Sequence, residues 1–240
     1  RRQRQMCIRD SIYPTIKIPR NMRIFLDTAD TEVINKHYVT GLIDGVTTNP
    51  TLIRKSGRDP IKVYEELAEL GLTDISMEVG GNAMEMVEEG KRLSTLFGKV
   101  ATIKVPCTVE GLWVCRELKR NLINVNVTLI FSAAQAILAA KAGAKYVSPF
   151  VGRLNDNSVN GLDLIQEINS IFTMQGVHET EILSASIRDV SGVSGSFARG
   201  ADIVTMPPSV FEKMYNHILT DKGLELFNAD LESIANANHS

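Results

Sequence analysis

The chain has 240 residues, of which 44% are hydrophobic and 22% are charged, and its formal net charge is −2. This composition is typical of a soluble globular protein and excludes an intrinsically disordered chain, a disulfide-stapled miniprotein and a collagen-like fibre. No apolar run approaches the roughly 20 residues that cross a bilayer, and no overall basic charge favours nucleic acid, so we expect neither a membrane nor a nucleic-acid partner.

The first 21 residues differ from the rest of the chain. They carry six basic residues against one acidic residue, show neither a helix nor a strand period, and are interrupted by Pro14 and Pro19. A transit peptide or a basic nucleic-acid-binding arm is one interpretation of such a segment. We instead predict that 1–21 is a non-native or disordered extension, and that 22–240 forms the folded part.

From Met22 onward, short apolar runs alternate with segments of helical period. The runs are almost continuously apolar, as in parallel strands that are buried on both faces. The predicted strands are 24–27, 45–49, 74–79, 101–106, 125–130, 146–151, 181–187 and 202–206. The predicted helices are 60–70, 83–97, 109–119, 133–142, 161–174 and 208–219, with an extra helix at 221–235. Asp30 and Ser132 are candidate helix N-caps, and Gly71 and Gly143 stand where helix-ending glycines belong.

About eight strand–helix units in this length predict an α/β fold, a single (β/α)8 TIM barrel followed by an extra C-terminal helix. A doubly wound open sheet is the alternative, because periodicity does not reveal closure. No glycine-rich phosphate loop follows the first strand, which disfavours the nucleotide-binding form of the open sheet.

The spacing of the cysteines and histidines bears on whether the chain forms disulfides or binds a metal. The three cysteines have no paired spacing, which predicts reduced thiols and a cytoplasmic location. The four histidines are scattered without metal-ligand spacing, so we predict no metal site.

Catalytic side chains of a (β/α)8 barrel project from the carboxyl ends of its strands. Polar residues interrupt the apolar pattern at or just after these ends. They are Asp27, Thr47, Thr48, Asn49, Glu78, Lys104, Asn126, Thr128, Ser148, Arg153, Ser186 and Arg188.

Lys104 is the most informative of these residues, because it lies within an apolar strand. Burial favours the neutral form of an amine, and a neutral amine in an apolar barrel can attack a carbonyl to form a Schiff base. The alternative is a structural lysine that is paired with a carboxylate of a neighbouring strand or that extends to the rim. Asp27 and Glu78 are compatible with both interpretations, since carboxylates serve ion pairs and proton transfer equally.

Five stretches in order resemble the signature stretches of the transaldolase family. They are LDT at 26–28, VTTNP at 46–50, IKVP at 103–106, VTLIFS at 127–132 and YVSPFVGR at 146–153. Their length and order are similar to those of the small-subunit branch, which includes the fructose 6-phosphate aldolases. The resemblance extends from Met22 to about Leu219 and implies a cytoplasmic homo-oligomer, a decamer in that branch, acting on sugar phosphates.

The resemblance also implies a role for each candidate. Lys104 would be the Schiff-base lysine, Asp27 the acid and base, and Glu78 and Thr128 the residues that manage the water of the carbinolamine. The substrate-binding residues would be Asn49, Asn126, Thr47 and Phe150. The substrate phosphate would be bound by Ser148, Arg153, Ser186 and Arg188. No metal or organic cofactor is implied.

The implied reaction is that of a transaldolase of the pentose phosphate pathway, which moves a dihydroxyacetone unit between sugar phosphates. A fructose 6-phosphate aldolase that releases free dihydroxyacetone is the alternative within the family. Glu78, Asn126 and Phe150 match the transaldolase pattern, where the aldolase pattern has Gln, an apolar residue and Tyr. A non-catalytic sugar-phosphate-binding barrel is a third reading, which Lys104 argues against. Ile187 departs from the aromatic residue of the family pattern between the phosphate-site serine and arginine.

Overall fold

A computed structural model describes residues 22–237 of the chain. Its eight parallel strands form a closed barrel in which each strand pairs with the next one along the chain and β8 pairs with β1. This confirms the predicted (β/α)8 barrel and excludes the open doubly wound sheet. The predicted extension at 1–21 lies outside the described residues.

The strands are short and mostly buried. They are β1 (Arg23–Asp27), β2 (Gly45–Thr47), β3 (Asp74–Glu78), β4 (Ala101–Pro106), β5 (Asn124–Ile130), β6 (Tyr146–Pro149), β7 (Glu181–Ser184) and β8 (Ile203–Met206). β2, β6 and β7 end two or three residues earlier than the sequence predicts. Apolar residues continue past the last ladder pair of β6 and β7, whereas the polar residues Thr48 and Asn49 follow β2.

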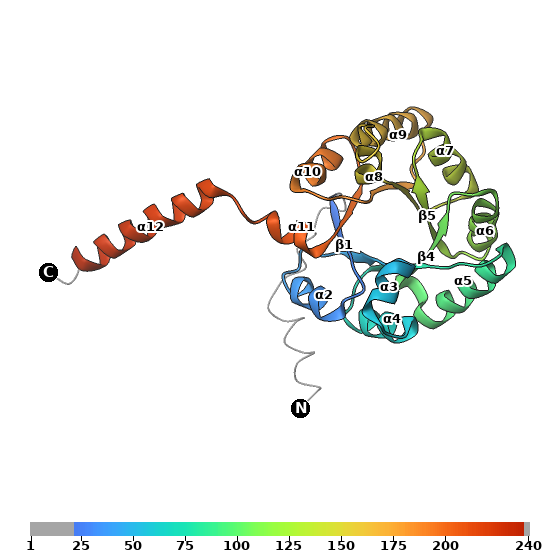
Figure 1. The fold of residues 1–240 in the computed structure, drawn as a ribbon, viewed down its shortest axis with the longest axis horizontal. Helices are drawn as coiled ribbons and strands as arrows, with labels where there is room; N and C mark the ends of the chain where they lie inside the picture. Colours follow the sequence, from blue (N-terminus) through green and yellow to red (C-terminus); the bar gives the residue numbers. More distant parts are fainter. Residues whose placement is uncertain (1–21, 238–240) are drawn as a thin grey trace.

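The helices form a ring around the strands, except for the last one along the chain, which lies outside the ring (Figure 1). They are α2 (Thr31–Tyr38), α3 (Pro50–Ser56), α4 (Pro60–Glu69), α5 (Ala83–Phe97), α6 (Val109–Arg120), α7 (Ala133–Ala142), α8 (Val151–Asn155), α9 (Gly161–Gln175), α10 (Val190–Ala198), α11 (Pro208–Lys213) and α12 (Ile218–Ala237), with a 3-10 turn at Gly98–Val100. Both predicted N-caps are confirmed, since Asp30 accepts from the amides of α2 and Ser132 from the amide of Gln135. None of the helices in the described part is long and apolar enough to cross a membrane.

The sequence did not predict α2, α3, α8 and α10, each of which has nine residues or fewer. So few turns give little apolar periodicity, and side-chain caps mark the starts of α2, α3 and α10 but not of α8. The prediction of one helix at 208–219 is wrong. α11 ends at Lys213, and α12 begins at Ile218 after a turn, where His217 Nδ1 accepts from the amide of Leu219.

Two separate apolar cores hold the barrel. The larger one lies between the strands and the surrounding helices. The smaller one fills the barrel interior and consists of Phe25, Tyr146, Leu183, Ala185 and Ile203, with Phe150 packed against it. Below this interior cluster, at the amino ends of the strands, the buried Asp74 Oδ2 accepts from Thr102, Lys145 and Tyr146 at 3.0, 2.7 and 2.8 Å. This polar network seals the floor of the barrel, so the interior opens toward the carboxyl ends.

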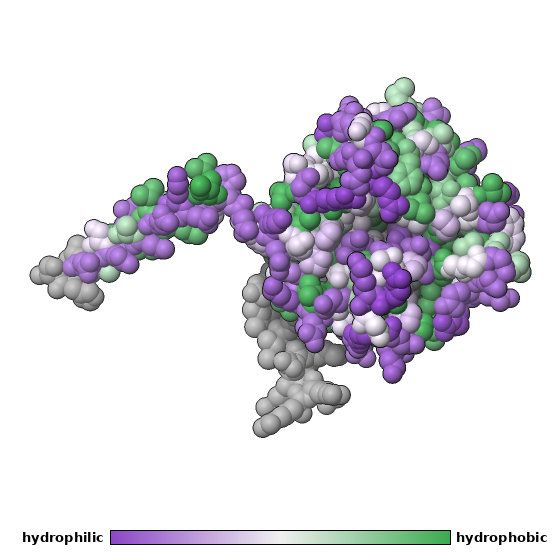
Figure 2. Space-filling model, viewed as in Figure 1, coloured by the Kyte–Doolittle hydropathy of each residue, from purple (hydrophilic) through white to green (hydrophobic). Residues whose placement is uncertain are grey.

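α12 projects away from the barrel (Figure 1). Apolar and polar residues share its surface (Figure 2). Leu224, Phe227, Leu231 and Ile234, spaced by three or four residues, are 53%, 67%, 64% and 59% exposed. This spacing places the four side chains on one face of the helix, an apolar stripe without cover in the single chain.

Candidate active site

A polar cavity of about 140 Å³ lies at the carboxyl end of the barrel. Ten of the twelve residues to which the resemblance assigns a role line it, and Glu78 and Arg188 do not. The lining residues are Asp27, Thr47, Asn49, Lys104, Asn126, Thr128, Ser148, Phe150, Arg153, Leu183, Ala185, Ser186 and Thr205. The barrel therefore brings together side chains from strands that lie far apart in the sequence.

Lys104 enters the cavity from β4 and is 6% exposed. Its Nζ lies 2.9 Å from Glu78 Oε2 of the neighbouring strand β3 and donates to the carbonyl of Thr48 at 3.0 Å. Glu78 pairs in register with Lys104, which explains why the carboxylate meets the amine. The ion pair considered as an alternative for Lys104 thus exists, and the same carboxylate can also exchange a proton with the amine that lines the cavity.

Asp27 lies at the end of β1 and receives a hydrogen bond of 2.8 Å from the Thr47 hydroxyl to Oδ1. Burial raises the pKa of the Asp27 carboxyl above its ordinary value. The hydrogen bond from Thr47 and the positive charge of Lys104 lower this pKa, while the negative charge of Glu78 raises it. A carboxyl with a raised pKa is suited to exchange protons near neutral pH.

The β5 side of the cavity carries an unsatisfied hydroxyl. Thr128 is buried, and its Oγ1 makes no hydrogen bond with any residue from 22 to 237. The backbone at Leu129 has φ of 59° and the pairing of β5 with β6 shifts its register there. An unsatisfied buried hydroxyl beside an amine is a site for a water molecule or a substrate hydroxyl.

Asn126 is held from two sides deeper in the barrel. Its Nδ2 donates to Ser76 Oγ at 3.2 Å, and its Oδ1 accepts from Ser148 Oγ at 2.6 Å. The two serine hydroxyls thereby hold the Asn126 amide between them. Asn49 is also partly committed, because its Oδ1 caps α3 by accepting from the Leu52 amide at 3.0 Å. Its Nδ2 is left as the group that can donate to a ligand.

Gly152 brings the end of β7 against the start of α8. Its amide donates to the Ser186 carbonyl at 3.0 Å, and a Cβ at position 152 would lie 2.0 Å from that oxygen. Ser186 has φ of 58°, a left-handed conformation that is uncommon for a residue with a side chain. Arg153, next to Gly152, has its guanidinium carbon 4.9 Å from the ring centroid of Phe150. Arg153 and Ser186 thus reach the cavity from two adjoining segments.

The structure separates the four residues that were predicted to bind phosphate. Arg153 and Ser186 line the mouth, whereas Ser148 is fully buried and its hydroxyl is bonded to Asn126. Arg188 is exposed, and both terminal nitrogens of its guanidinium lie 2.6 Å from the carboxylate of Asp156. Ser148 thus lines the cavity while its hydroxyl bonds to Asn126, and Arg188 reaches a ligand only beside or in place of Asp156.

Comparison with known proteins relates this geometry to a family. The family model of transaldolase/fructose-6-phosphate aldolase matches residues 24–240. The chain belongs to this family. Membership agrees with the resemblance found in the five sequence stretches.

Relatives within the transaldolase and aldolase family are similar over nearly their whole length. A probable transaldolase of Caulobacter sp. (strain K31) is 50% identical over 210 residues, covering 87% of this chain and 96% of the relative. A probable transaldolase of Caulobacter vibrioides is 49% identical over 213 residues, covering 88% and 97%. One from Ruegeria sp. (strain TM1040) is 48% identical over the same length and coverage.

Sequence reasoning missed three polar residues in or next to the site of this family member, besides the apolar lining residues Leu183 and Ala185. Thr205 lines the cavity from β8, Ser76 supports Asn126 from below, and Asp156 holds Arg188. Thr205 could have been found, because it is a polar residue within the last apolar strand. Ser76 carries the same signal, since it lies between Ile75 and Met77 in β3, whereas Asp156 lies outside the strands and is recognised only by its contact with Arg188.

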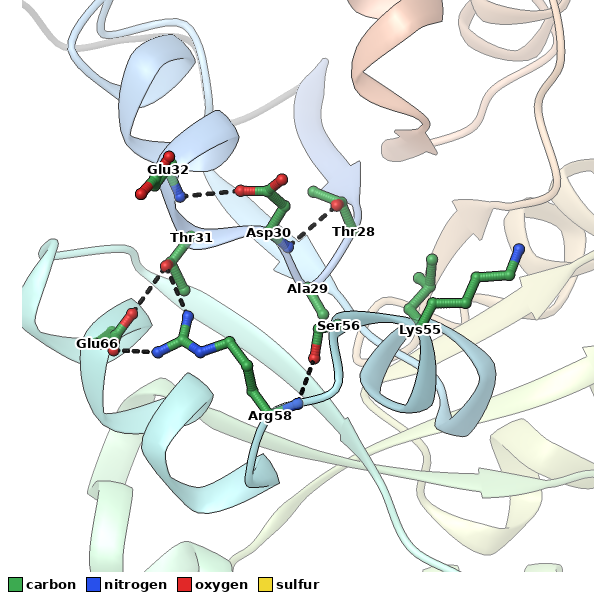
Figure 3. Close-up of a pocket in the computed structure, with 10 residues that line it drawn as sticks. Thr28, Ala29, Asp30, Thr31, Glu32, Lys55, Ser56, Arg58 and Glu66 are labelled. Carbon is green, nitrogen blue, oxygen red and sulfur yellow. Dashed lines mark hydrogen bonds and ion pairs between the residues drawn. The ribbon is translucent and has the colours of Figure 1, made fainter.

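A larger cavity of about 650 Å³ lies beside the transaldolase-family site, between α2, α3 and α4 (Figure 3). Three of its charged side chains are held by hydrogen bonds to neighbouring groups. Arg58 donates to Glu66 and to Thr31, and Asp30 accepts from the amides of its own helix (Figure 3). Lys55 points away from these groups. Despite its size this cavity lacks the convergence of amine, carboxylate and hydroxyls that marks the barrel mouth.

Proposed function

We propose that this protein is a transaldolase of the pentose phosphate pathway. It transfers a dihydroxyacetone unit from sedoheptulose 7-phosphate to glyceraldehyde 3-phosphate, which yields erythrose 4-phosphate and fructose 6-phosphate. The observation that carries the proposal is the buried amine of Lys104, which lies 2.9 Å from the Glu78 carboxylate in a cavity that also holds Asp27.

The first step is formation of an imine on Lys104. Glu78 accepts the ammonium proton, and the neutral amine adds to the C2 carbonyl of the ketose to give a carbinolamine. Glu78 returns the proton to the carbinolamine hydroxyl, which leaves as water, and the C2–N bond becomes an iminium. The free hydroxyl of Thr128 is available to bind that water.

The second step is cleavage of the C3–C4 bond. Asp27 removes the proton of the C4 hydroxyl, and the electrons of the C3–C4 bond move into the iminium. An aldose phosphate leaves, and the three-carbon unit remains as an enamine on Lys104. The acceptor aldehyde then bonds to the enamine carbon, Asp27 returns its proton to the new hydroxyl, and water releases the ketose. Asp27 thus acts as base and as acid in one cycle.

The remaining polar groups hold the sugar at its two ends. The Asn126 and Ser148 pair and the Nδ2 of Asn49 bind hydroxyls of the donor, and Thr47 orients Asp27. Arg153 and Ser186 bind the phosphate at the mouth, with Arg188 beside them. Arginine suits this role because its planar fork makes charge-assisted bonds to phosphate.

Transfer is favoured over release of dihydroxyacetone. Phe150 lines the cavity, and its ring has no proton to give to the enamine. An enamine that is poorly supplied with protons persists until an aldehyde accepts it.

Trapping the imine tests the proposal. Borohydride with fructose 6-phosphate is expected to leave a reduced adduct on Lys104, located by mass spectrometry of peptides. Lys145, paired with Asp74 at the opposite end of the barrel, serves as the internal control and should carry none. Lys104→Met should abolish both the adduct and turnover, whereas Lys141→Met on the outer surface of α7 should not. An adduct at another lysine, or turnover by Lys104→Met, would exclude the mechanism.

We further propose that the protein is a cytoplasmic homo-oligomer. The apolar stripe of α12, defined above by Leu224, Phe227, Leu231 and Ile234, supports association with a second copy, because large apolar patches are rarely left open to water. A groove between α7 and α9, lined by Ile137, Ala140, Ile171 and Phe172 among others, offers a second apolar surface. The free thiols of Cys107 and Cys115 are consistent with a reducing compartment.

A further inference from the structure

Three hydroxyl and carboxyl groups form a chain of hydrogen bonds across the barrel interior. Thr205 of β8 and Thr47 of β2 lie on either side of β1, and their Oγ1 atoms are 2.6 Å apart. Thr47 Oγ1 in turn lies 2.8 Å from Asp27 Oδ1. Both threonines are almost fully buried, and both line the cavity.

The direction of these hydrogen bonds follows from the number of protons. An ionised carboxylate only accepts, so the single hydroxyl proton of Thr47 is donated to Asp27. Thr47 therefore has no proton left for Thr205, and Thr205 must donate to Thr47. The chain runs from Thr205 to Thr47 to Asp27, and each donor polarises the next one.

We propose that Thr205 is a positioning residue for the reaction, which through Thr47 fixes Asp27 so that Oδ2 exchanges the proton with the substrate. Oδ1 is occupied by the Thr47 hydroxyl. The proposal rests on the proposed function, because it takes Asp27 as the acid and base.

The hydrogen bonds that run from Thr205 through Thr47 to Asp27 can be altered without altering the charged groups near Asp27. The charges that act on the Asp27 carboxyl are Lys104 of β4 and Glu78 of β3. Arg153 of α8 is the other charged residue among those that line the cavity. The adjacent strands β2 and β8 contribute the hydroxyls of Thr47 and Thr205. Removing the Thr205 hydroxyl changes none of the charges.

Substitution of Thr205 tests the proposal in the full-length protein. Thr205→Val keeps the shape and removes the donor, and Thr205→Ser keeps the donor. Release of glyceraldehyde 3-phosphate from fructose 6-phosphate in a single turnover is followed across pH. For Thr205→Val we expect a rate constant about 2- to 12-fold lower, the effect of one hydrogen bond, with a nearly unchanged KM. The acid limb should move to higher pH, because a weakened bond from Thr47 raises the pKa of Asp27. Thr205→Ser should restore both the rate constant and the position of the acid limb.

The matched control is Thr180→Val. Thr180 is also buried, and its hydroxyl donates to the carbonyl of Ala144 at 2.7 Å outside the cavity. It should lower Tm and leave the acid limb in place. If Thr205→Val does not fold, Thr205→Ala, which introduces no new bulk, carries the same test.

Borohydride trapping in parallel separates the two proposals. If the wild type forms no adduct on Lys104, the proposed function fails. If wild type and Thr205→Val both form the adduct and share the same rate constant and acid limb, the role of Thr205 alone is excluded. A Thr205→Ser variant as impaired as Thr205→Val would also overturn it, since packing of the methyl group would then explain the loss.

Discussion

Replacing Gly152 with alanine should damage the phosphate end of the site through a single methyl group. The added Cβ would stand 2.0 Å from the Ser186 carbonyl oxygen, which the Gly152 amide now holds at 3.0 Å. A carbon and an oxygen need more than 3 Å, so the two segments must separate by about 1 Å or more. The obstacle is backbone, which cannot turn aside as the end of a side chain can.

The structure sets the size of the expected effect. Overpacking of this kind costs about 1–3 kcal/mol, and in a protein of this size each kcal/mol lowers Tm by about 2–4 °C. Ser186 and Arg153 flank the strained contact, and misplacing a binding group by about 1 Å can cost up to 100-fold in rate. We therefore expect Tm to fall by roughly 2–12 °C. We also expect kcat/KM for glyceraldehyde 3-phosphate to fall by about 10- to 100-fold, and that for unphosphorylated glyceraldehyde to fall less.

Gly195→Ala is the control for this substitution. Its Cβ would meet the Cδ1 of Leu162 at 2.6 Å, and that atom is the end of a flexible side chain that can move. Calorimetry and steady-state kinetics with both acceptors complete the test. If Gly152→Ala keeps the wild-type Tm and kcat/KM, the contact between α8 and the end of β7 does not position the phosphate site. Equal losses with both acceptors would show that the contact supports the whole mouth.

Three further predictions concern the phosphate, the reaction and the assembly. Arg188→Ala should lower kcat/KM for glyceraldehyde 3-phosphate by about 10-fold. This is the lower end of the range for a charge-assisted hydrogen bond, and it is expected because the Arg188 side chain is 56% exposed. An equal loss with unphosphorylated glyceraldehyde would contradict phosphate binding by Arg188. With fructose 6-phosphate and erythrose 4-phosphate, formation of sedoheptulose 7-phosphate should greatly exceed release of free dihydroxyacetone, and comparable rates would assign the protein to the aldolases. Phe227→Asp together with Leu231→Asp should lower the molar mass measured by light scattering, whereas Glu232→Gln should not; an unchanged mass would exclude association through the apolar stripe.

The barrel could be predicted from the sequence because its strands are apolar on both faces. That pattern produces eight apolar runs, one for each strand. Capping residues such as Asp30 and Ser132 follow such runs and mark the start of a helix. The short helices α3 and α8 could not be predicted in the same way. Asn49 and Pro50 begin α3 by a cap and a proline, and Phe150 begins α8 without any side-chain cap, so neither helix depends on a buried apolar face long enough to be seen.

The site was predictable where a polar residue interrupts a strand, as at Lys104 and Asn126. The hydrogen-bond partner of a site residue was not predictable where the fold offers that side chain two possible partners. The bond from Ser148, a predicted phosphate ligand, to Asn126 was not predicted, although both side chains lie on strands of the predicted barrel. Arg188 was expected at the mouth, yet Asp156 from the turn after α8 holds it. Such choices depend on distances between segments, which sequence spacing does not contain.

The division between the two apolar cores has a consequence for which positions of this protein can be substituted. The interior core is a thin layer, from Phe25 to Ile203, between the sealed floor at Asp74 and the polar cavity. Most apolar burial lies outside the strands, against the helices. Side chains that face the barrel axis above that layer can therefore be exchanged without opening a cavity in the larger apolar core. New substrates can be acquired at the mouth while the outer shell, untouched, keeps the chain folded.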